Sequence, residues 1–291
     1  MTKPVAMNTA TTRRQWRLDE AIDGYARHGA GGIVPWRDQV LDLGVATAAR
    51  RIREAGMYVT GYCRGGMFPA SDPISRRQAI DDNRRMIEEA AELGAPVLVL
   101  VCGGLADGST DIGAARSMIA QGISEIMEDA RQAGVRLAIE PLHPMYAADR
   151  SCINTLAQAN DICDLLEPEG PSVLGVAVDV YHVWWDPNAA DGIRRAGSQR
   201  LLGFHLCDWL MPTKDMLNDR GLMGDGVIDL PRFAELIDAA GFRHTAEVEI
   251  FSETMWRMDP DELTRRCIER AGPLVAGLSS HGPGAEPVST S

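Results

Sequence analysis

The chain has 291 residues, of which 45% are hydrophobic and 24% charged, the composition of an ordinary soluble globular protein. Its formal net charge of −12 excludes the basic surface that sequence-independent nucleic-acid binding needs, and no apolar run approaches the ~20 residues of a membrane span. The six cysteines form no CxxC pair, which predicts free thiols. The first residues lack a secretory signal pattern, so we expect a cytoplasmic protein with no nucleic-acid or membrane partner.

Short apolar segments recur along the chain, and each predicts a β-strand. In chain order they are residues 4–10, 31–36, 57–63, 95–103, 135–142, 174–181, 201–209 and 245–252. Between them lie helix-type segments such as residues 17–29, 44–56, 75–94, 115–134, 154–167, 229–241 and 260–272. Several of these segments end in a glycine suited to a left-handed helix C-cap.

The alternation of strands and helices, with about 30 to 35 residues per unit, indicates a parallel sheet. A doubly wound open sheet is the alternative, but no strand precedes a G-x-G-x-x-G sequence, and CGGLADG at residues 102–108 does not match it. The strand count and a length near the ~250 residues typical of the fold favour a single (β/α)8 TIM barrel. We expect the barrel to span residues 1–281, followed by a flexible tail at residues 282–291.

Ionisable residues stand at the ends of the last four predicted strands, and they are Glu140, Asp179, His205 and Glu249. Taken singly, each fits a structural role. The carboxyl ends of barrel strands meet at one mouth, however, so three carboxylates there would repel one another unless a cation joined them. Three carboxylates and one imidazole form an oxygen-rich set that suits Mn²⁺, with Mg²⁺, Co²⁺ or Ni²⁺ as alternatives.

Several motifs carry a family resemblance: EPLHP at residues 140–144, VDVYHVWW at 178–185, FHLCDW at 204–209, GDGVIDL at 224–230 and EVEIFSE at 247–253. They resemble the xylose-isomerase-like (β/α)8 superfamily of sugar isomerases, epimerases and inosose-processing enzymes. The resemblance covers roughly residues 6–275. It implies that Glu140, Asp179, His205 and Glu249 bind one divalent metal. The endonuclease IV branch, with further histidine ligands and a basic DNA face, does not fit an acidic chain with six histidines.

The chemistry that this resemblance implies is removal of the proton α to a carbonyl of a sugar, oxo-sugar or cyclitol, with a metal stabilising the enediolate. Glu140 and Glu249 are candidates for both ligand and base. His143, three residues after Glu140, is a further candidate base, and His182 has the same spacing from Asp179. Both histidines also fit as loop residues bonded to backbone.

Further residues are candidates for substrate binding: His182, Arg220, Trp36, Arg37, Trp184 and Tyr146. Arg220 resembles the family's substrate-gripping arginine ahead of Gly-Asp-Gly, and tryptophans offer faces on which sugars stack. A solvated loop or core packing is the alternative for these positions. Tyr146 stands where the ketose 3-epimerases are expected to have a second glutamate, six residues after Glu140, which argues against epimerisation of free ketoses.

The sequence therefore predicts a metal-dependent sugar isomerase or epimerase acting on a small carbohydrate. The alternative is a lyase, because the chain is also similar to the large catalytic subunit of bacterial C-glycoside deglycosidases, which cleave 3-oxo-C-glycosides by β-elimination. A non-catalytic binding barrel is a third possibility, although the complete ligand set argues against it. We expect a homo-oligomer, or a hetero-oligomer with a small second subunit if the protein is a deglycosidase.

Overall fold

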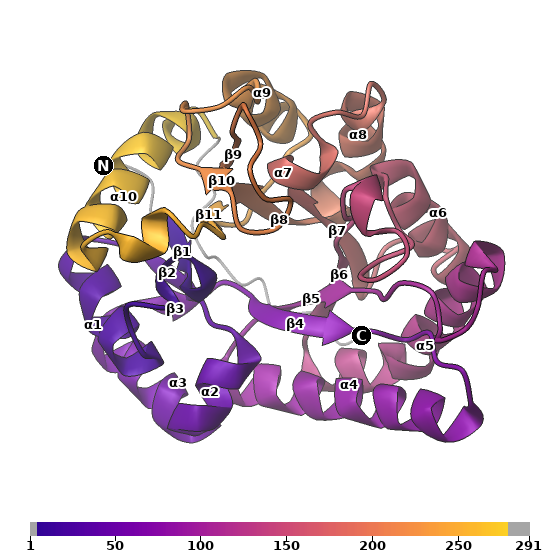
Figure 1. Ribbon diagram of the computed structural model, residues 1–291. Helices are drawn as coiled ribbons and strands as arrows, with labels where there is room; N and C mark the ends of the chain where they lie inside the picture. Colours follow the sequence, from indigo (N-terminus) through magenta and orange to yellow (C-terminus); the bar gives the residue numbers. More distant parts are fainter. Residues whose placement is uncertain (1–4, 279–291) are drawn as a thin grey trace.

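The computed structural model describes residues 5–278, whose strands form a ring of parallel strands surrounded by helices (Figure 1). The strand order is β3-β2-β1-β11-β8-β7-β6-β5-β4. These strands are β1 (Ala6–Asn8), β2 (Gly32–Val34), β3 (Tyr58–Val59), β4 (Tyr62–Gly66), β5 (Val97–Val101), β6 (Arg136–Ile139), β7 (Leu174–Asp179), β8 (Leu201–Leu206) and β11 (Glu247–Val248). Each of the predicted strand segments contains one or more of them.

The sheet closes through its third strand, which is split into β3 and β4. β3 pairs with β2, whereas β4 pairs with β5, and a parallel bridge between Trp36 and Cys63 joins the end of β2 to β4. β3 and β4 together therefore fill one place in the barrel, and the predicted TIM barrel is confirmed. At the carboxyl end of β8, β9 (Asp208–Trp209) and β10 (Arg220–Gly221) form a small antiparallel pair.

The helices lie outside the ring of strands (Figure 1). They are α1 (Leu18–Arg27), α2 (Arg37–Leu43), α3 (Val45–Glu54), α4 (Pro73–Leu93), α5 (Ile112–Ala133), α6 (Leu156–Leu166), α7 (Val180–Val183), α8 (Ala189–Arg200), α9 (Leu230–Ala239) and α10 (Pro260–Ala276), with the short turns η1 (Thr9–Thr12), η2 (Pro144–Tyr146) and η3 (Met255–Arg257). As predicted, α4 and α5 end at left-handed glycines, Gly94 and Gly134. None of the helices within residues 5–278 has the length and hydropathy of a membrane span. The predicted tail at residues 282–291 lies outside the described residues.

A small apolar layer lies inside the barrel, formed by Val97, Ala138, Ala177 and Leu202 from four neighbouring strands. Side chains two residues apart on a strand point to the same face of the sheet. Residues two positions beyond Ala138 and Ala177 therefore point inward as well, nearer the carboxyl ends of the strands. These positions are occupied by Glu140 and Asp179. The strand period thus places carboxylates directly beyond an apolar layer.

Candidate metal centre

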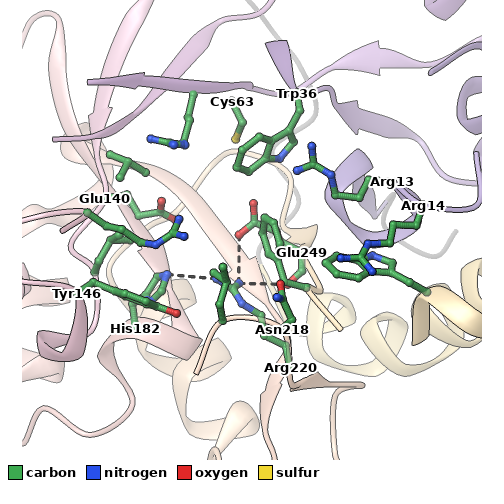
Figure 2. A pocket seen from close by; sticks show the side chains of 17 residues that line it. Arg13, Arg14, Trp36, Cys63, Glu140, Tyr146, His182, Asn218, Arg220 and Glu249 are labelled. Atoms are coloured by element: carbon green, nitrogen blue, oxygen red, sulfur yellow. Dashed lines mark hydrogen bonds and ion pairs between the residues drawn. The ribbon is translucent and has the colours of Figure 1, made fainter. Parts of the chain in front are cut away.

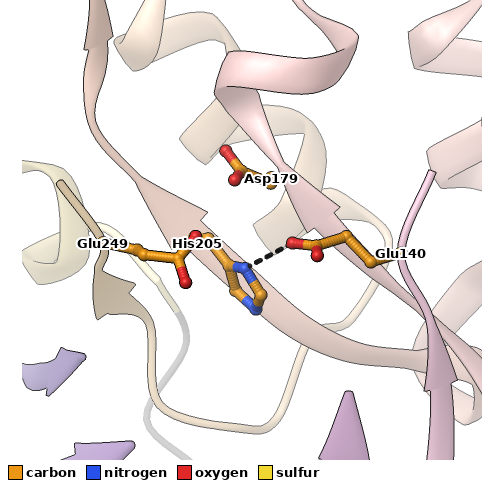
Figure 3. Close-up of side chains that lie close together, drawn as sticks. All are labelled: Glu140, Asp179, His205 and Glu249. Atoms are coloured by element: carbon orange, nitrogen blue, oxygen red, sulfur yellow. Dashed lines mark ion pairs between the residues drawn. The ribbon is translucent and has the colours of Figure 1, made fainter. Parts of the chain in front are cut away.

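The predicted ligands come together at the carboxyl end of the barrel. Each of Glu140, Asp179, His205 and Glu249 offers one ligand atom, and these atoms all lie within 4.8 Å of one another. All four residues are buried. Figure 3 shows Glu249 and Glu140 on opposite sides of His205, with Asp179 beside them. Side chains far apart in the sequence therefore form one compact cluster.

Several polar atoms in this cluster lack a hydrogen-bond partner. His205 Nδ1 lies 3.0 Å from Glu140 Oε1, an ion-pair contact that does not have the geometry of a hydrogen bond. His205 Nε2 also lacks a hydrogen bond. Unsatisfied polar atoms are costly when buried, since they lose water without gaining a partner. One divalent cation among these atoms would satisfy an imidazole nitrogen and the carboxylate oxygens together. The residues therefore fit such a cation.

Arg220, on β10, reaches into the same cluster (Figure 2). Its Nη1 donates to Asp179 Oδ2 at 2.8 Å and to Glu249 Oε2 at 3.1 Å. The guanidinium also lies 4.5 Å from the ring centre of Tyr181 and 5.1 Å from that of Phe251. Burial opposes the ionisation of Asp179, but Arg220, the neighbouring histidines and the backbone N–H of Tyr181 together lower the pKa of this carboxyl. The predicted substrate-gripping arginine thus contacts two predicted metal ligands.

The two histidines near the site lie in different surroundings. His182 lines the cavity, and its Nε2 lies 3.2 Å from Arg220 Nη2. His143 does not line the cavity: its ring packs 5.2 Å from the ring of Trp209 and 5.6 Å from that of Trp185. Its Nδ1 accepts a hydrogen bond from the backbone N–H of Met145 at 3.3 Å, which caps η2. The structure therefore does not bring the predicted base His143 to the cavity.

His182 is held as a neutral imidazole. Burial lowers the pKa of His182 to about 4, although the charge of Asp179 acts in the opposite direction. Its Nδ1 lies 3.2 Å from the backbone N–H of His143, and its Nε2 faces the guanidinium of Arg220. A neutral imidazole accepts through only one nitrogen, so it cannot accept hydrogen bonds from both donors. With Nδ1 accepting the backbone N–H of His143, Nε2 carries the proton and can donate to an acceptor in the cavity.

Two further residues hold the ligands in place, and the sequence analysis did not single them out. Asn8, at the end of β1, donates through Nδ2 to Glu249 Oε1 at 2.9 Å and to Glu247 Oε1 at 3.1 Å. Glu247 Oε1 lies 3.6 Å from His205 Nε2. Partners behind the ligands commonly fix their orientation and tautomer. The alternation in EVE, which puts Glu247 on the same face as Glu249, was the signal available in the sequence.

The Gly-Asp-Gly loop is fastened to the site by Asp208. The carboxylate of Asp208 accepts the backbone N–H groups of Gly224, Gly226 and Ile228 at 2.9, 2.9 and 3.1 Å. A Cβ at Gly226 would lie 2.2 Å from the carbonyl oxygen of Trp209, so only glycine fits there. The motif therefore serves to hold the segment after β10 against the strand that follows His205.

A cavity of about 380 Å³ opens above the cluster (Figure 2). Glu140, Glu249, His182 and Arg220 line it, as do the predicted substrate contacts Trp36 and Tyr146. The indole of Trp36 is oriented by a 2.8 Å hydrogen bond from its Nε1 to Asn8 Oδ1. Pockets of this size, with apolar walls and a few directed polar groups, suit small ligands.

The chain matches a known family of proteins. The family described as xylose isomerase-like TIM barrel matches residues 22–271. The chain belongs to this family. Inosose isomerase of Bacillus velezensis is 23% identical over 292 residues, covering 94% of this chain and 97% of its own.

Two solved structures of the xylose isomerase-like fold are similar to the chain. Protein SMc04130 of Sinorhizobium meliloti 1021 is 55% identical with a TM-score of 0.90, covering 93% of this chain and 98% of its own. The IOLI protein with a binding zinc atom is 19% identical with a TM-score of 0.82, covering 96% of this chain and 100% of its own. The similarity to the latter shows the shared fold.

Two of the predicted substrate-binding residues, Arg37 and Trp184, lie away from the cavity. Arg37 is directed to α4, where it contacts Glu89 at 2.8 Å and Asp82 at 2.9 Å. Trp184 packs with its ring centre 5.5 Å from that of Trp209. Their neighbours in the sequence, Trp36 and His182, line the cavity instead. Arg37 therefore joins helices of the outer layer, and Trp184 belongs to the packing of the loop after β7.

Proposed function

We propose that the protein is a divalent-metal-dependent enzyme that isomerises or epimerises a carbonyl-bearing sugar or cyclitol by removing the proton α to the carbonyl. The observation that carries this proposal is the buried cluster of Glu140, Asp179, His205 and Glu249 beneath a small cavity. The similarity to inosose isomerase supports an isomerase acting on a polyhydroxylated carbonyl compound.

Glu140, Asp179, His205 and Glu249 would hold the cation. When bound, a divalent cation supplies Lewis-acid stabilisation of the negative charge that develops on the substrate oxygens. Mn²⁺ is the ion we propose, because three carboxylates and one imidazole suit it and no cysteine belongs to the cluster. Asn8 and Glu247 keep the carboxylate and imidazole ligands oriented.

Glu249 and Glu140 are the groups that we assign to proton transfer. Both line the cavity, and they approach the cluster from opposite sides (Figure 3). In the metal-free site, burial raises the pKa of Glu249, the charge of Arg220 opposes this rise, and the charges of Glu140 and Asp179 add to it. Asn8 donates to Oε1 of Glu249 and Arg220 donates to Oε2, so both carboxylate oxygens are held in place beside the cavity.

The remaining cavity residues position the substrate. Because Nδ1 of the neutral His182 ring accepts the backbone N–H of His143, its Nε2–H can donate to a substrate oxygen. Arg220 donates to substrate oxygens from beside Asp179 and Glu249. Trp36 presents an aromatic wall whose orientation is fixed by Asn8. Holding the reacting carbon against a carboxylate in this way lowers the entropic part of the barrier.

Proton exchange in D₂O tests this function. The Mn²⁺-loaded protein is incubated with a panel of ketoses, inososes and 3-oxo-glycosides, and deuterium at the α-carbon is followed by NMR. Incorporation without loss of a substituent supports an isomerase or epimerase. Release of an aglycone would instead show β-elimination and redirect the assignment to the lyase. No exchange or release with any compound by a protein that binds metal would overturn the proposal.

A further inference from the structure

Among the residues that the structure describes, two arginines of the cavity wall lack a close carboxylate partner. Arg64 lies in β4, where the register shifts between Cys63 and Gly65, and both Cys63 and Arg64 line the cavity. Such irregularities often redirect a side chain next to an active site. Arg150 lines the same cavity from the loop after η2, with its guanidinium 5.5 Å from the ring centre of Tyr146.

The other arginines that line the cavity are paired with carboxylates. Arg13 lies 2.7 Å from Asp38, and Arg14 lies 2.7 Å from Glu253. Arg220 is paired with Asp179 and Glu249. The positive charge of each of these three arginines is therefore offset by a carboxylate of the chain itself. Figure 2 shows Arg13 and Arg14 together beyond Trp36, on the side of the cavity away from Glu140 and Tyr146.

Arg64 and Arg150 are different in this respect. Within residues 5–278, the side chain of Arg64 makes no hydrogen bond or ion pair, and its guanidinium lies 5.9 Å from the ring centre of Trp36. Arg150 reaches only its chain neighbour Asp149, at 3.8 Å, and the Asp149 side chain is 67% exposed. An ion pair of this length near solvent contributes little to the stability of the fold.

The two guanidinium groups also act on each other. Burial, and then the positive charge of Arg150, lowers the pKa of Arg64 from its ordinary value. Partly buried cations that repel each other destabilise the fold unless something compensates their charge. Glu140 and Glu249 act on Arg64 in the opposite direction, but within residues 5–278 no carboxylate forms an ion pair with its guanidinium. A guanidinium that lines the cavity without an ion-pair partner among the described residues points to an anionic ligand.

We propose that Arg64 and Arg150 form an anion subsite, so that the substrate carries a carboxylate or phosphate group in addition to its reacting carbonyl. This inference rests on the proposed function, because it identifies the class of sugar that the same cavity takes. A guanidinium presents paired N–H donors that match the oxygens of either anion. The rings of Trp36 and Tyr146 lie next to these two arginines and help to hold their planes.

Binding, measured separately from turnover, tests the subsite. Isothermal titration of the Mn²⁺-loaded protein compares D-fructose, D-fructose 6-phosphate and D-fructuronate, which differ only at C6. We expect at least one anionic compound to bind about 10-fold or more tightly than fructose, the usual effect of a hydrogen bond to a charged group. The phosphate and carboxylate arms distinguish a sugar phosphate from a sugar acid. An anion that binds no more tightly than fructose would overturn the inference.

Variants assign the effect to the two arginines. Arg64→Gln and Arg150→Gln should each bring the ratio of anion to neutral affinity toward one, whereas Arg64→Lys should retain part of it. Arg13→Gln, which removes a paired cavity arginine, and Arg53→Gln, which removes an exposed arginine of α3, are the controls. Far-ultraviolet circular dichroism verifies folding. An equal loss in Arg13→Gln, or an unchanged ratio in the folded Arg64 and Arg150 variants, would contradict the assignment.

The outcomes separate this inference from the proposed function. Preferential anion binding that depends on Arg64, without deuterium exchange into any carbonyl compound, would establish the subsite and contradict the isomerase. Exchange into neutral sugars with no Arg64-dependent preference would support the isomerase and overturn the subsite.

Discussion

Arg220 Nη1 lies 2.8 Å from Asp179 Oδ2, which places a cation of the chain itself against a carboxylate that we assign to metal binding. Both side chains are almost fully buried. Removing one member of such a pair leaves the other charge uncompensated. The contact implies that Arg220 and a bound cation share the negative charge of the same carboxylates.

Arg220→Gln should therefore lower kcat/KM without lowering the affinity for Mn²⁺. Without the guanidinium, Asp179 and Glu249 hold more negative charge for the cation, so Mn²⁺ affinity should be unchanged or higher. The substrate loses a donor, and kcat/KM should fall about 10-fold or more. Titration calorimetry with Mn²⁺ and α-proton exchange measure the two effects. A fall in Mn²⁺ affinity would show that Arg220 supports the metal site instead.

The ligand set makes a prediction about thermal stability. A cation that binds only the folded state stabilises it by about 2.7 kcal/mol when its concentration is 100 times the Kd. Mn²⁺ should therefore raise the Tm of the wild-type protein, and this rise should be lost in Asp179→Asn and His205→Ala. Glu253→Gln, an exposed carboxylate paired with Arg14, is a matched control that should retain it. An equal rise in the ligand variants would exclude this cluster as the metal site.

His143 and His182 can be compared directly, because each lies three residues after a predicted metal ligand. The sequence predicts His143 as a base, whereas the structure places His182 in the cavity and His143 between Trp185 and Trp209. His182→Ala should lower α-proton exchange by about 10-fold or more, because the substrate loses a hydrogen-bond partner in the cavity. The His143→Ala variant should show a smaller loss. The reverse order of effects, with both variants folded, would restore the sequence-based assignment.

The protonation of His182 makes a prediction about acid stability. In the unfolded chain a histidine titrates near ~6.5, whereas in the folded protein the pKa of His182 is about 4. Between these values the unfolded state binds more protons, so His182 contributes a loss of stability as pH falls from about 6.5 toward 4. Urea unfolding of metal-free wild type and His182→Gln across this range should show a shallower pH dependence in the variant. Identical slopes would contradict a buried neutral imidazole.

Strand period and strand ends were sufficient to predict much of the site. Glu140, Asp179, His205 and Glu249 could be found because each ends an apolar segment, and parallel strands bring their carboxyl ends together. The split of the third strand was not predictable in the same way. Gly66 extends β4 past the predicted end at residue 63, and a Cβ there would lie 2.0 Å from the carbonyl oxygen of Val101.

Side-chain directions in loops could not be predicted, since they depend on contacts between distant segments. Arg37 turns toward α4 because Asp82 and Glu89, far along the chain, face it there. His143 turns away from the cavity because it caps η2 and packs between tryptophans. The role of Arg64 likewise depends on a local change of strand register that composition and spacing do not indicate.

Metal-dependent α-proton exchange by the purified protein tests the central claim most directly. Exchange of deuterium into a carbonyl sugar or cyclitol is measured after chelation with EDTA and again after addition of Mn²⁺, alongside the metal content per chain. We predict one bound divalent ion per chain, exchange that is lost on chelation, and exchange restored by Mn²⁺ in wild type but not in Glu140→Gln. Undiminished exchange in the metal-free protein would contradict the account.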